Sequence, residues 1–198
     1  VYANEKDPTG SVTVVGAIDI EAFRNPDGGG ELSIASAVNT RRWVDSYAAT
    51  TTIPYFNFGA CIGCPVQGPL PLDRGPIVGS NWSWEDYWYV SWGVVNAFPF
   101  PQIYLLNTQE LQWANVKRWA ETCTNCEPVR RGGIWRTIYF SGALTQEKAC
   151  EQKARQSVIE DSCRPPNANS PSRGWTSLIS ATNQMFLRWS SDMMWDQP

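Results

Sequence analysis

The chain has 198 residues, of which 42% are hydrophobic and 18% charged, so it is too apolar and too weakly charged to be disordered, and it is long enough for one domain. Its net charge of −3 argues against a basic surface that would bind nucleic acid. The sequence contains no run of about 18 apolar residues, so we predict no membrane-spanning helix. The absence of histidine excludes Ser-His-Asp and Cys-His nucleophile pairs, which leaves acid–base chemistry to carboxylates, Lys, Tyr or Cys.

The first half of the chain predicts strands separated by helical or looped connections. Polar residues 1–11 are typical of a linker, and a β-branched run then predicts the first strand. The expected elements are a strand over 12–21, a glycine-rich loop over 25–30, a helix over 31–49, a strand over 53–59, a proline-rich loop over 61–76, and short strands over 88–92 and 102–105.

The second half continues the alternation. Asn107 with Glu110 resembles a capping box, and it opens a helix whose apolar positions recur at helical spacing. Those positions are Trp113, Val116, Ala120 and Cys123. After it we expect a strand over 137–141, a charged helix capped by Thr145 to about residue 160, a loop over 164–174, a short helix over 175–184 and a last strand over 186–192. This alternation favours parallel strands in one α/β domain.

Side chains alternate along each predicted strand, which gives one polar-aromatic face and one apolar face. In the second strand, for example, Tyr55 and Asn57 oppose Phe56 and Phe58. An antiparallel sheet with one wet face is one interpretation. We favour a (β/α) TIM-like barrel with the polar face inside and the apolar face under the helices, over other α/β arrangements. With about six strands visible, such a barrel would be incomplete or trimmed at its N-terminus.

The six cysteines form two CxxC pairs, Cys61/Cys64 and Cys123/Cys126, together with Cys150 and Cys163. Two CxxC pairs allow a four-thiolate zinc site or redox chemistry, but they lie far beyond the usual ribbon spacing of about 15–20 residues. We favour three disulfides, with each CxxC closed on itself and Cys150 bonded to Cys163. This pattern suits an oxidising, extracellular compartment.

Asp19 and Glu21 are the strongest chemical signal in the sequence. Carboxylates at i and i+2 of a strand point the same way, about 6.5–7 Å apart at the backbone. The proximity of like charges raises one pKa, so that one carboxyl can donate a proton at neutral pH. Glycosidic bonds are cleaved by such pairs. Alternatively, the two residues bond loop backbone or Arg24, or join Asp192 in an oxygen-ligand metal site.

Aromatic and amide residues at strand ends complete the predicted site. The chain has 11 tryptophans, and those on the predicted helix, Trp113 and Trp119, are expected to pack in the core. Others in loops or at strand ends, including Trp82, Trp84 and Trp195, could stack on sugar rings. The predicted substrate-binding residues are Tyr55, Asn57, Trp92, Gln102, Tyr104 and Trp189.

The run Gly16-Ala17-Ile18-Asp19-Ile20-Glu21 resembles the Asp-x-Glu strand of secreted bacterial glycoside-hydrolase-like barrels related to the lysozyme (muramidase) class. Later segments resemble the later strands of extracellular members of that group: Tyr55 to Gly59, Tyr89 to Gly93, Pro101 to Tyr104, and Trp189 to Asp192. The resemblance implies a catalytic Glu21, a partner carboxylate Asp19 and a last-strand Asp192. A first-strand Asp that the group carries has no counterpart here.

The sequence therefore predicts a single extracellular, glycoside-hydrolase-like domain over 1–198 that acts on polysaccharide or cell-wall glycan without a cofactor. Glu21 is the expected general acid, while Asp19 and Asp192 complete the acidic cluster. The alternative is a non-catalytic carbohydrate-binding or surface-structural domain that uses aromatic residues at loop tips. Neither nucleic acid nor a membrane is an expected partner, and the oligomeric state stays open.

Overall fold

The computed structural model describes residues 14–22, 36–78, 80–126, 137–155, 163, 169–185 and 187–192. The expected linker over 1–11 and the glycine-rich loop over 25–30 lie outside these residues. In chain order the elements are β1 (Gly16–Ile18), α2 (Ala37–Thr50), β2 (Tyr55–Asn57), α3 (Trp84–Trp88), the π-helix η1 (Tyr89–Gly93), β3 (Ala97–Pro99), α4 (Gln109–Thr122), β4 (Gly142–Thr145), α5 (Glu147–Arg155), α6 (Pro171–Thr182) and β5 (Trp189–Asp192).

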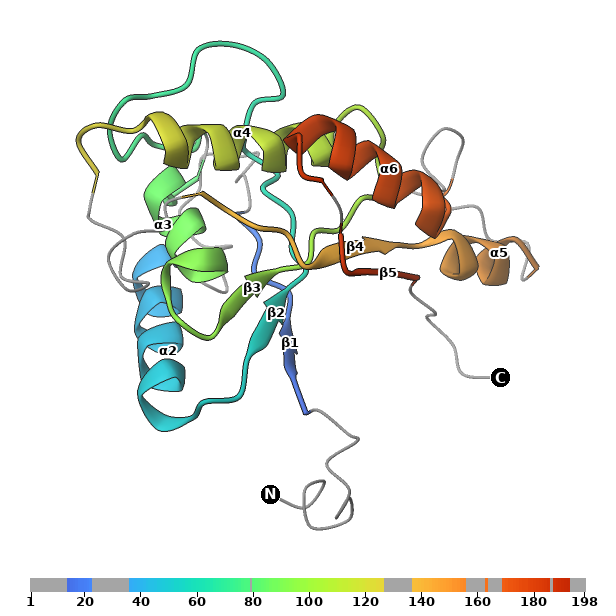
Figure 1. The fold of residues 1–198 in the computed structure, drawn as a ribbon, viewed down its shortest axis with the longest axis horizontal. Helices are drawn as coiled ribbons and strands as arrows, with labels where there is room; N and C mark the ends of the chain where they lie inside the picture. Colours follow the sequence, from blue (N-terminus) through green and yellow to red (C-terminus); the bar gives the residue numbers. More distant parts are fainter. Residues whose placement is uncertain are drawn as a thin grey trace.

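The strands form two small parallel sheets, one of β1, β2 and β3 in that order and one of β4 and β5. A single bridge between Gln102 and Leu144 links the sheets, and the Ser141 amide also donates to the Pro99 carbonyl at 2.9 Å. Helices α2 and α3 lie beside the first sheet and α4 and α6 run above the strands (Figure 1). The arrangement is therefore mixed α/β with every strand pairing parallel.

The expected TIM-like barrel is wrong. Among the described residues there are two sheets of three and two strands, and β1 and β5 do not pair with each other, so no barrel closes. One cause lies at 88–92, which the sequence analysis assigned to a strand. These residues complete α3 and form η1, because Ser83 caps α3 and the aromatic run beyond it is buried on all sides.

Several boundaries also differ from the expectations. The third strand is Ala97–Pro99, which we did not predict, and of the expected strand over 102–105 only Gln102 forms a bridge. The strand expected over 137–141 lies at 142–145, and the last strand begins at Trp189. The helices expected over 31–49 and from Asn107 are confirmed in their described parts as α2 and α4, and Trp113, Val116, Ala120 and Cys123 are buried.

The orientation of β2 is the reverse of the expected one. Tyr55 is buried against α2 through Trp43 and Tyr47, and its hydroxyl donates to the Val90 carbonyl at 2.6 Å. Phe56, on the opposite face, contacts other aromatic rings away from the helices. The polar face of this strand faces the helices because the π-helix supplies hydrogen-bond partners there.

The expected disulfides are confirmed. Cys61 bonds to Cys64, Cys123 to Cys126 and Cys150 to Cys163, so no free thiolate remains for zinc or redox chemistry. In the described part of the chain no three His, Cys, Asp or Glu side chains gather as a metal site would require. Nor does any helix among those residues have the length and apolar character needed to cross a bilayer.

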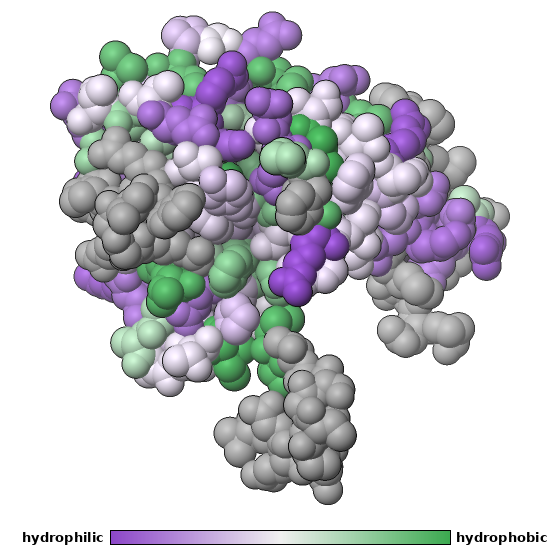
Figure 2. Space-filling model, viewed as in Figure 1, coloured by the Kyte–Doolittle hydropathy of each residue, from purple (hydrophilic) through white to green (hydrophobic). Residues whose placement is uncertain are grey.

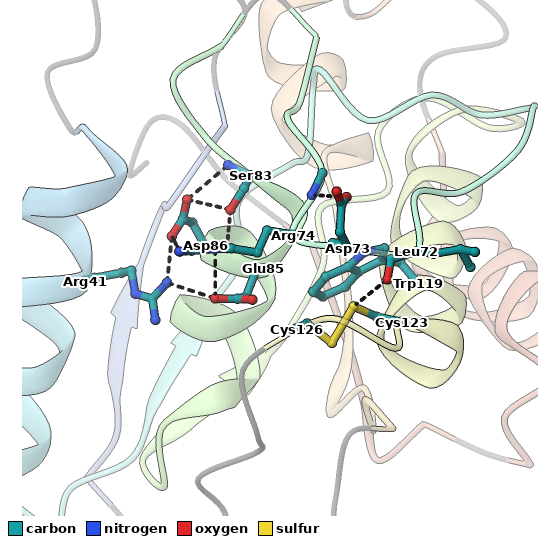
Figure 3. Close-up of polar contacts among 11 residues, drawn as sticks. Arg41, Leu72, Asp73, Arg74, Ser83, Glu85, Asp86, Trp119, Cys123 and Cys126 are labelled. Carbon is teal, nitrogen blue, oxygen red and sulfur yellow. Dashed lines mark hydrogen bonds and ion pairs between the residues drawn. A yellow bond between two sulfur atoms is a disulfide. The ribbon is translucent and has the colours of Figure 1, made fainter.

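A buried ion-pair cluster joins α2 and the loop at 73–76 to the start of α3 (Figure 3). The Glu85 carboxylate lies 3.2 Å from Arg74 and 3.5 Å from Arg41, and Arg41 also bonds Asp86 at 2.7 Å. Asp86 and Ser83 bond each other's backbone amides in a capping box. Burial alone would raise the pKa of Asp86, but the Ser83 hydroxyl and Arg41 outweigh it and lower the pKa.

We expect Glu85→Gln to lower the free energy of unfolding by about 3 kcal/mol, because it leaves two guanidinium groups short of a buried counter-charge. Urea denaturation followed by circular dichroism measures the change. The control is Glu151→Gln, which removes an exposed pair with Lys148 and should have no measurable effect. Equal stability of both variants would contradict a stabilising role for the cluster.

Candidate functional site

Asp19 and Glu21 lie just beyond the carboxyl end of β1. Because the strands are parallel, the residues that follow β2 and β3 meet at the same edge, as chemistry-bearing residues do in open α/β sheets. Asp19 is exposed and accepts a hydrogen bond from the Gln102 amide at 3.3 Å, whereas Glu21 is half-buried. The structure therefore brings together Asp19, Glu21 and Gln102 from the predicted set.

Burial and, to a smaller extent, the negative charge of Asp19 raise the pKa of Glu21 to about 7, against a lowering by a hydrogen bond from the Ala60 amide. Burial also raises the pKa of Asp19, against a lowering by the Gln102 hydrogen bond. Near pH 7 Glu21 is therefore protonated in about half of the molecules, so its carboxyl can both give up and take back a proton. Such a carboxyl is suited to donating a proton to a leaving group.

Asn57 fixes the backbone that carries the two carboxylates. Its side-chain oxygen accepts from the amides of Ile20 and Gly59, both at 3.0 Å, and its amide donates to the Ser91 hydroxyl at 2.9 Å. Asn57 has no exposed surface. We predicted it as a substrate-binding residue, but it lies beneath the site as a buried support. Ile20, between the two carboxylates, is the residue that it holds.

Gly59 is required by the same packing. A Cβ built at this position would lie 2.0 Å from the Ile20 carbonyl oxygen, so only glycine lets the loop after β2 pass β1. The next residue, Ala60, supplies the amide that bonds Glu21, and the buried disulfide between Cys61 and Cys64 follows directly. The position of Glu21 thus depends on a loop that a covalent bond restrains.

Two buried phenols border the carboxylates. The Tyr104 hydroxyl is buried without a hydrogen-bond partner among the described residues, whereas a hydrogen bond with the Asn57 side chain partly offsets the raised pKa of Tyr87. Burial raises the pKa of both, and the negative charges of Asp19 and Glu21 raise them further. Both hydroxyls are therefore protonated and able to donate. Tyr104 was predicted from its place on the polar face of the strand expected over 102–105, whereas Tyr87 was missed because its aromatic run gave no sign of its helical direction.

Asp192 has a different environment from the one expected. Its carboxylate accepts from the Thr145 hydroxyl at 2.8 Å and from the amides of Glu147 and Lys148 at 2.8 and 2.7 Å. It therefore caps the first turn of α5 from the neighbouring strand, where a negative charge stabilises the helix. The Asp192 carboxylate thus joins β4 to α5, and its connection to the Asp19–Glu21 pair is through charge, because all three carboxylates raise the pKa of Tyr104.

The remaining predicted aromatic residues divide by exposure. Tyr55 and Trp92 are buried, as are Trp82 and Trp84, so none of these presents a ring to a ligand. Trp189 is 42% exposed and lines a cavity of about 520 Å³ on the face of the strands opposite the helices. Trp195 lies outside the described residues. Of the predicted stacking residues in the described part of the chain, Trp189 alone is accessible.

No family model, curated protein or solved structure matches this chain. The resemblance to muramidase barrels therefore stays a hypothesis that rests on short motifs, and the assignment of function must come from the geometry of the site.

We expect Asn57→Ala to destabilise the fold by about 2 kcal/mol, because it leaves two backbone amides without their buried acceptor. Thermal and urea unfolding measure this change. Asn39→Ala, on an exposed position of α2, is the matched control and should not destabilise. If both variants unfolded alike, Asn57 would not be the support that its contacts indicate.

Removing the charge of Asp19 should lower the pKa of Glu21, since like charge is one of the two causes that raise it. In Asp19→Asn, carboxyl-carbon NMR titration should place the pKa of Glu21 below 7 but above its ordinary value of 4.5, because burial persists.

The raised pKa of Glu21 should also make the stability of the fold depend on pH. The folded chain holds the Glu21 proton more tightly than the unfolded chain, so the free energy of unfolding should fall as pH rises from 4.5 to 7. The Glu21→Gln variant should lack this contribution, and an unchanged pH profile in that variant would contradict the raised pKa.

Proposed function

We propose that the chain is an extracellular glycoside hydrolase that acts on polysaccharide or cell-wall glycan, with Glu21 as the general acid. The observation that carries the proposal is the carboxylate pair at the strand edge, in which Glu21 has a pKa of about 7 beside Asp19. A carboxyl that keeps its proton near neutral pH, next to one that is ionised, is the arrangement that cleaves glycosidic bonds.

In the proposed reaction the Glu21 proton passes to the glycosidic oxygen as the bond from this oxygen to the anomeric carbon breaks. The leaving sugar departs as an alcohol. Asp19, ionised and exposed, stabilises the positive charge that develops on the sugar ring. Water then supplies hydroxide to the anomeric carbon, and its remaining proton returns to Glu21, so the enzyme is regenerated.

The groups around the pair support binding of a hydroxylated substrate. Gln102 orients Asp19 by donating to its carboxylate, and the buried Tyr104 hydroxyl lies near enough to both carboxylates for their charges to raise its pKa. Asp192 takes no part in this proposal because its carboxylate caps α5. The three disulfides support the extracellular location, since such bonds persist in oxidising compartments.

Glu21→Gln should abolish release of reducing sugar from peptidoglycan and from a panel of polysaccharides without unfolding the chain. The measurement is sugar release at equal protein concentration, with circular dichroism as the test of folding. Glu121→Gln, an exposed glutamate on α4, is the matched control and should retain full activity. Activity of the unsubstituted chain should fall as pH rises above about 7, when Glu21 loses its proton.

Either of two results would overturn the proposal. Equal sugar release by the unsubstituted chain and Glu21→Gln would remove Glu21 from the chemistry. Glycan binding that survives Glu21→Gln, with no release by any variant, would favour the non-catalytic binding domain, for which the exposed ring of Trp189 is the structural argument.

A further inference from the structure

The face of the strands that the helices leave uncovered carries an aromatic cavity. It has a volume of about 520 Å³, within the range of about 300–1,000 Å³ usual for small-molecule sites. Its lining is Ala17 from β1, Phe56 and Phe58 from β2 and its exit, Phe100 after β3, Leu144 from β4, and Trp189, Ser190 and Ser191 from β5. Four strands, β1, β2, β4 and β5, contribute lining residues, and Phe100 directly follows β3.

The rings of this cavity form a continuous apolar wall. Phe56 lies at its centre, with its ring centroid 5.5 Å from that of Trp189 and 5.7 Å from that of Phe100, both in edge-to-face geometry. Gly142 has no side chain because a Cβ there would lie 2.3 Å from the Phe100 ring. Ser190 turns its hydroxyl away to the Pro171 carbonyl, which leaves the wall predominantly apolar.

The cavity is adjacent to the proposed catalytic pair. Residues two apart on a strand point to the same face, about 6.5–7 Å from each other. Ala17 precedes Asp19, the first residue beyond β1, by two residues, and Phe100, the first residue beyond β3, precedes Gln102 by two. The segments that line the cavity therefore lead directly to the Asp19–Gln102 hydrogen bond, and a group held among the rings lies near the Asp19 carboxylate.

Its surroundings also indicate an apolar ligand rather than another sugar. Sugar rings need several in-plane hydrogen-bond partners, whereas the lining residues offer six apolar side chains and two serines. Hydrophobic side chains continue beyond the cavity toward the start of β1, where Val14 and Val15 are 37% and 43% exposed. Figure 2 shows this hydrophobic surface in green near β1, at the lower centre of the view.

We propose that this cavity binds the apolar aglycone of a glycoside, an aryl ring or a short alkyl chain, while the sugar lies at Asp19 and Glu21. The inference rests on the proposed function for the position of the sugar, but the cavity itself is an independent observation. It narrows the substrate class of the proposed hydrolase from glycans in general to glycosides or glycans with an apolar group on the leaving side, in which burial of that group supplies binding energy.

The test uses methyl, phenyl and octyl β-glycosides of glucose and of N-acetylglucosamine, with octyl compounds kept below micelle formation. Binding is measured by calorimetry on Glu21→Gln, so that turnover does not interfere. Phenyl or octyl glycosides should bind about tenfold or more tightly than the methyl glycoside of the same sugar. A preference for phenyl over octyl, or the reverse, tells whether the aglycone is a ring or a chain.

Ala17→Leu fills the cavity and should remove most of that tenfold preference. Ala49→Leu, the same change at an exposed position of α2, is the matched control and should leave it unchanged. Trp189 should report occupancy directly, because the change in tryptophan fluorescence on adding the phenyl glycoside should be lost in Trp189→Phe. Equal binding of the three aglycones, no binding of any, or a preference that survives Ala17→Leu would overturn the proposal.

Failure of the two proposals can be told apart by adding hydrolysis of the same glycosides by the unsubstituted chain. If apolar glycosides bind more tightly in a way that depends on Ala17, but none is hydrolysed, the apolar subsite is supported and the proposed hydrolase activity is contradicted. If methyl and phenyl glycosides are hydrolysed at equal rates, and Ala17→Leu does not change these rates, the hydrolase activity is supported and the apolar subsite is contradicted.

Discussion

The side chain of Asn57 is the interaction on which the candidate site depends. One buried amide group bonds the chain beyond β1, the loop beyond β2 and the π-helix η1, so three segments remote in sequence are fixed to one point. A buried amide with its partners in place is stabilising, and with any of them missing it is costly. The carboxylates on either side of Ile20 owe their position to this single group.

In that geometry, burial and the charge of Asp19 both raise the pKa of Glu21. Placing Glu21 half inside the protein beside Asp19 disfavours its charged form, and the Ala60 amide offsets only part of this. The aromatic cavity on the same face adds a second consequence, because a low-polarity surface next to the carboxylates strengthens every charge interaction there. In the site that we propose, the apolar wall of the cavity and the raised pKa of Glu21 are thus complementary.

Sequence patterns located several features correctly. Spacing in the helix from Asn107 identified its buried face, and local CxxC spacing gave the disulfides, because both depend on short-range geometry. Asp19 and Gln102, both predicted from polar residues on strands, prove to be joined by a hydrogen bond, while their role in a functional site stays a prediction. The prediction of a barrel was wrong in part because the alternation within 88–92 is typical of a strand, whereas the Ser83 cap and the burial of these residues favour a helix.

By itself, the sequence determined the chemistry that is available: no imidazole, three local disulfides and two carboxylates two residues apart. Only the tertiary structure decided which polar residues serve that chemistry. Asn57 and Asp192 hold distant parts of the backbone and of other side chains, because several of their hydrogen-bond partners come from segments 34 to 45 residues away, which no local pattern reveals. The reversed face of β2 has the same origin, since the carbonyl that accepts from Tyr55 lies in the π-helix. Long-range hydrogen bonding, and not alternation, set which side of the strand is buried.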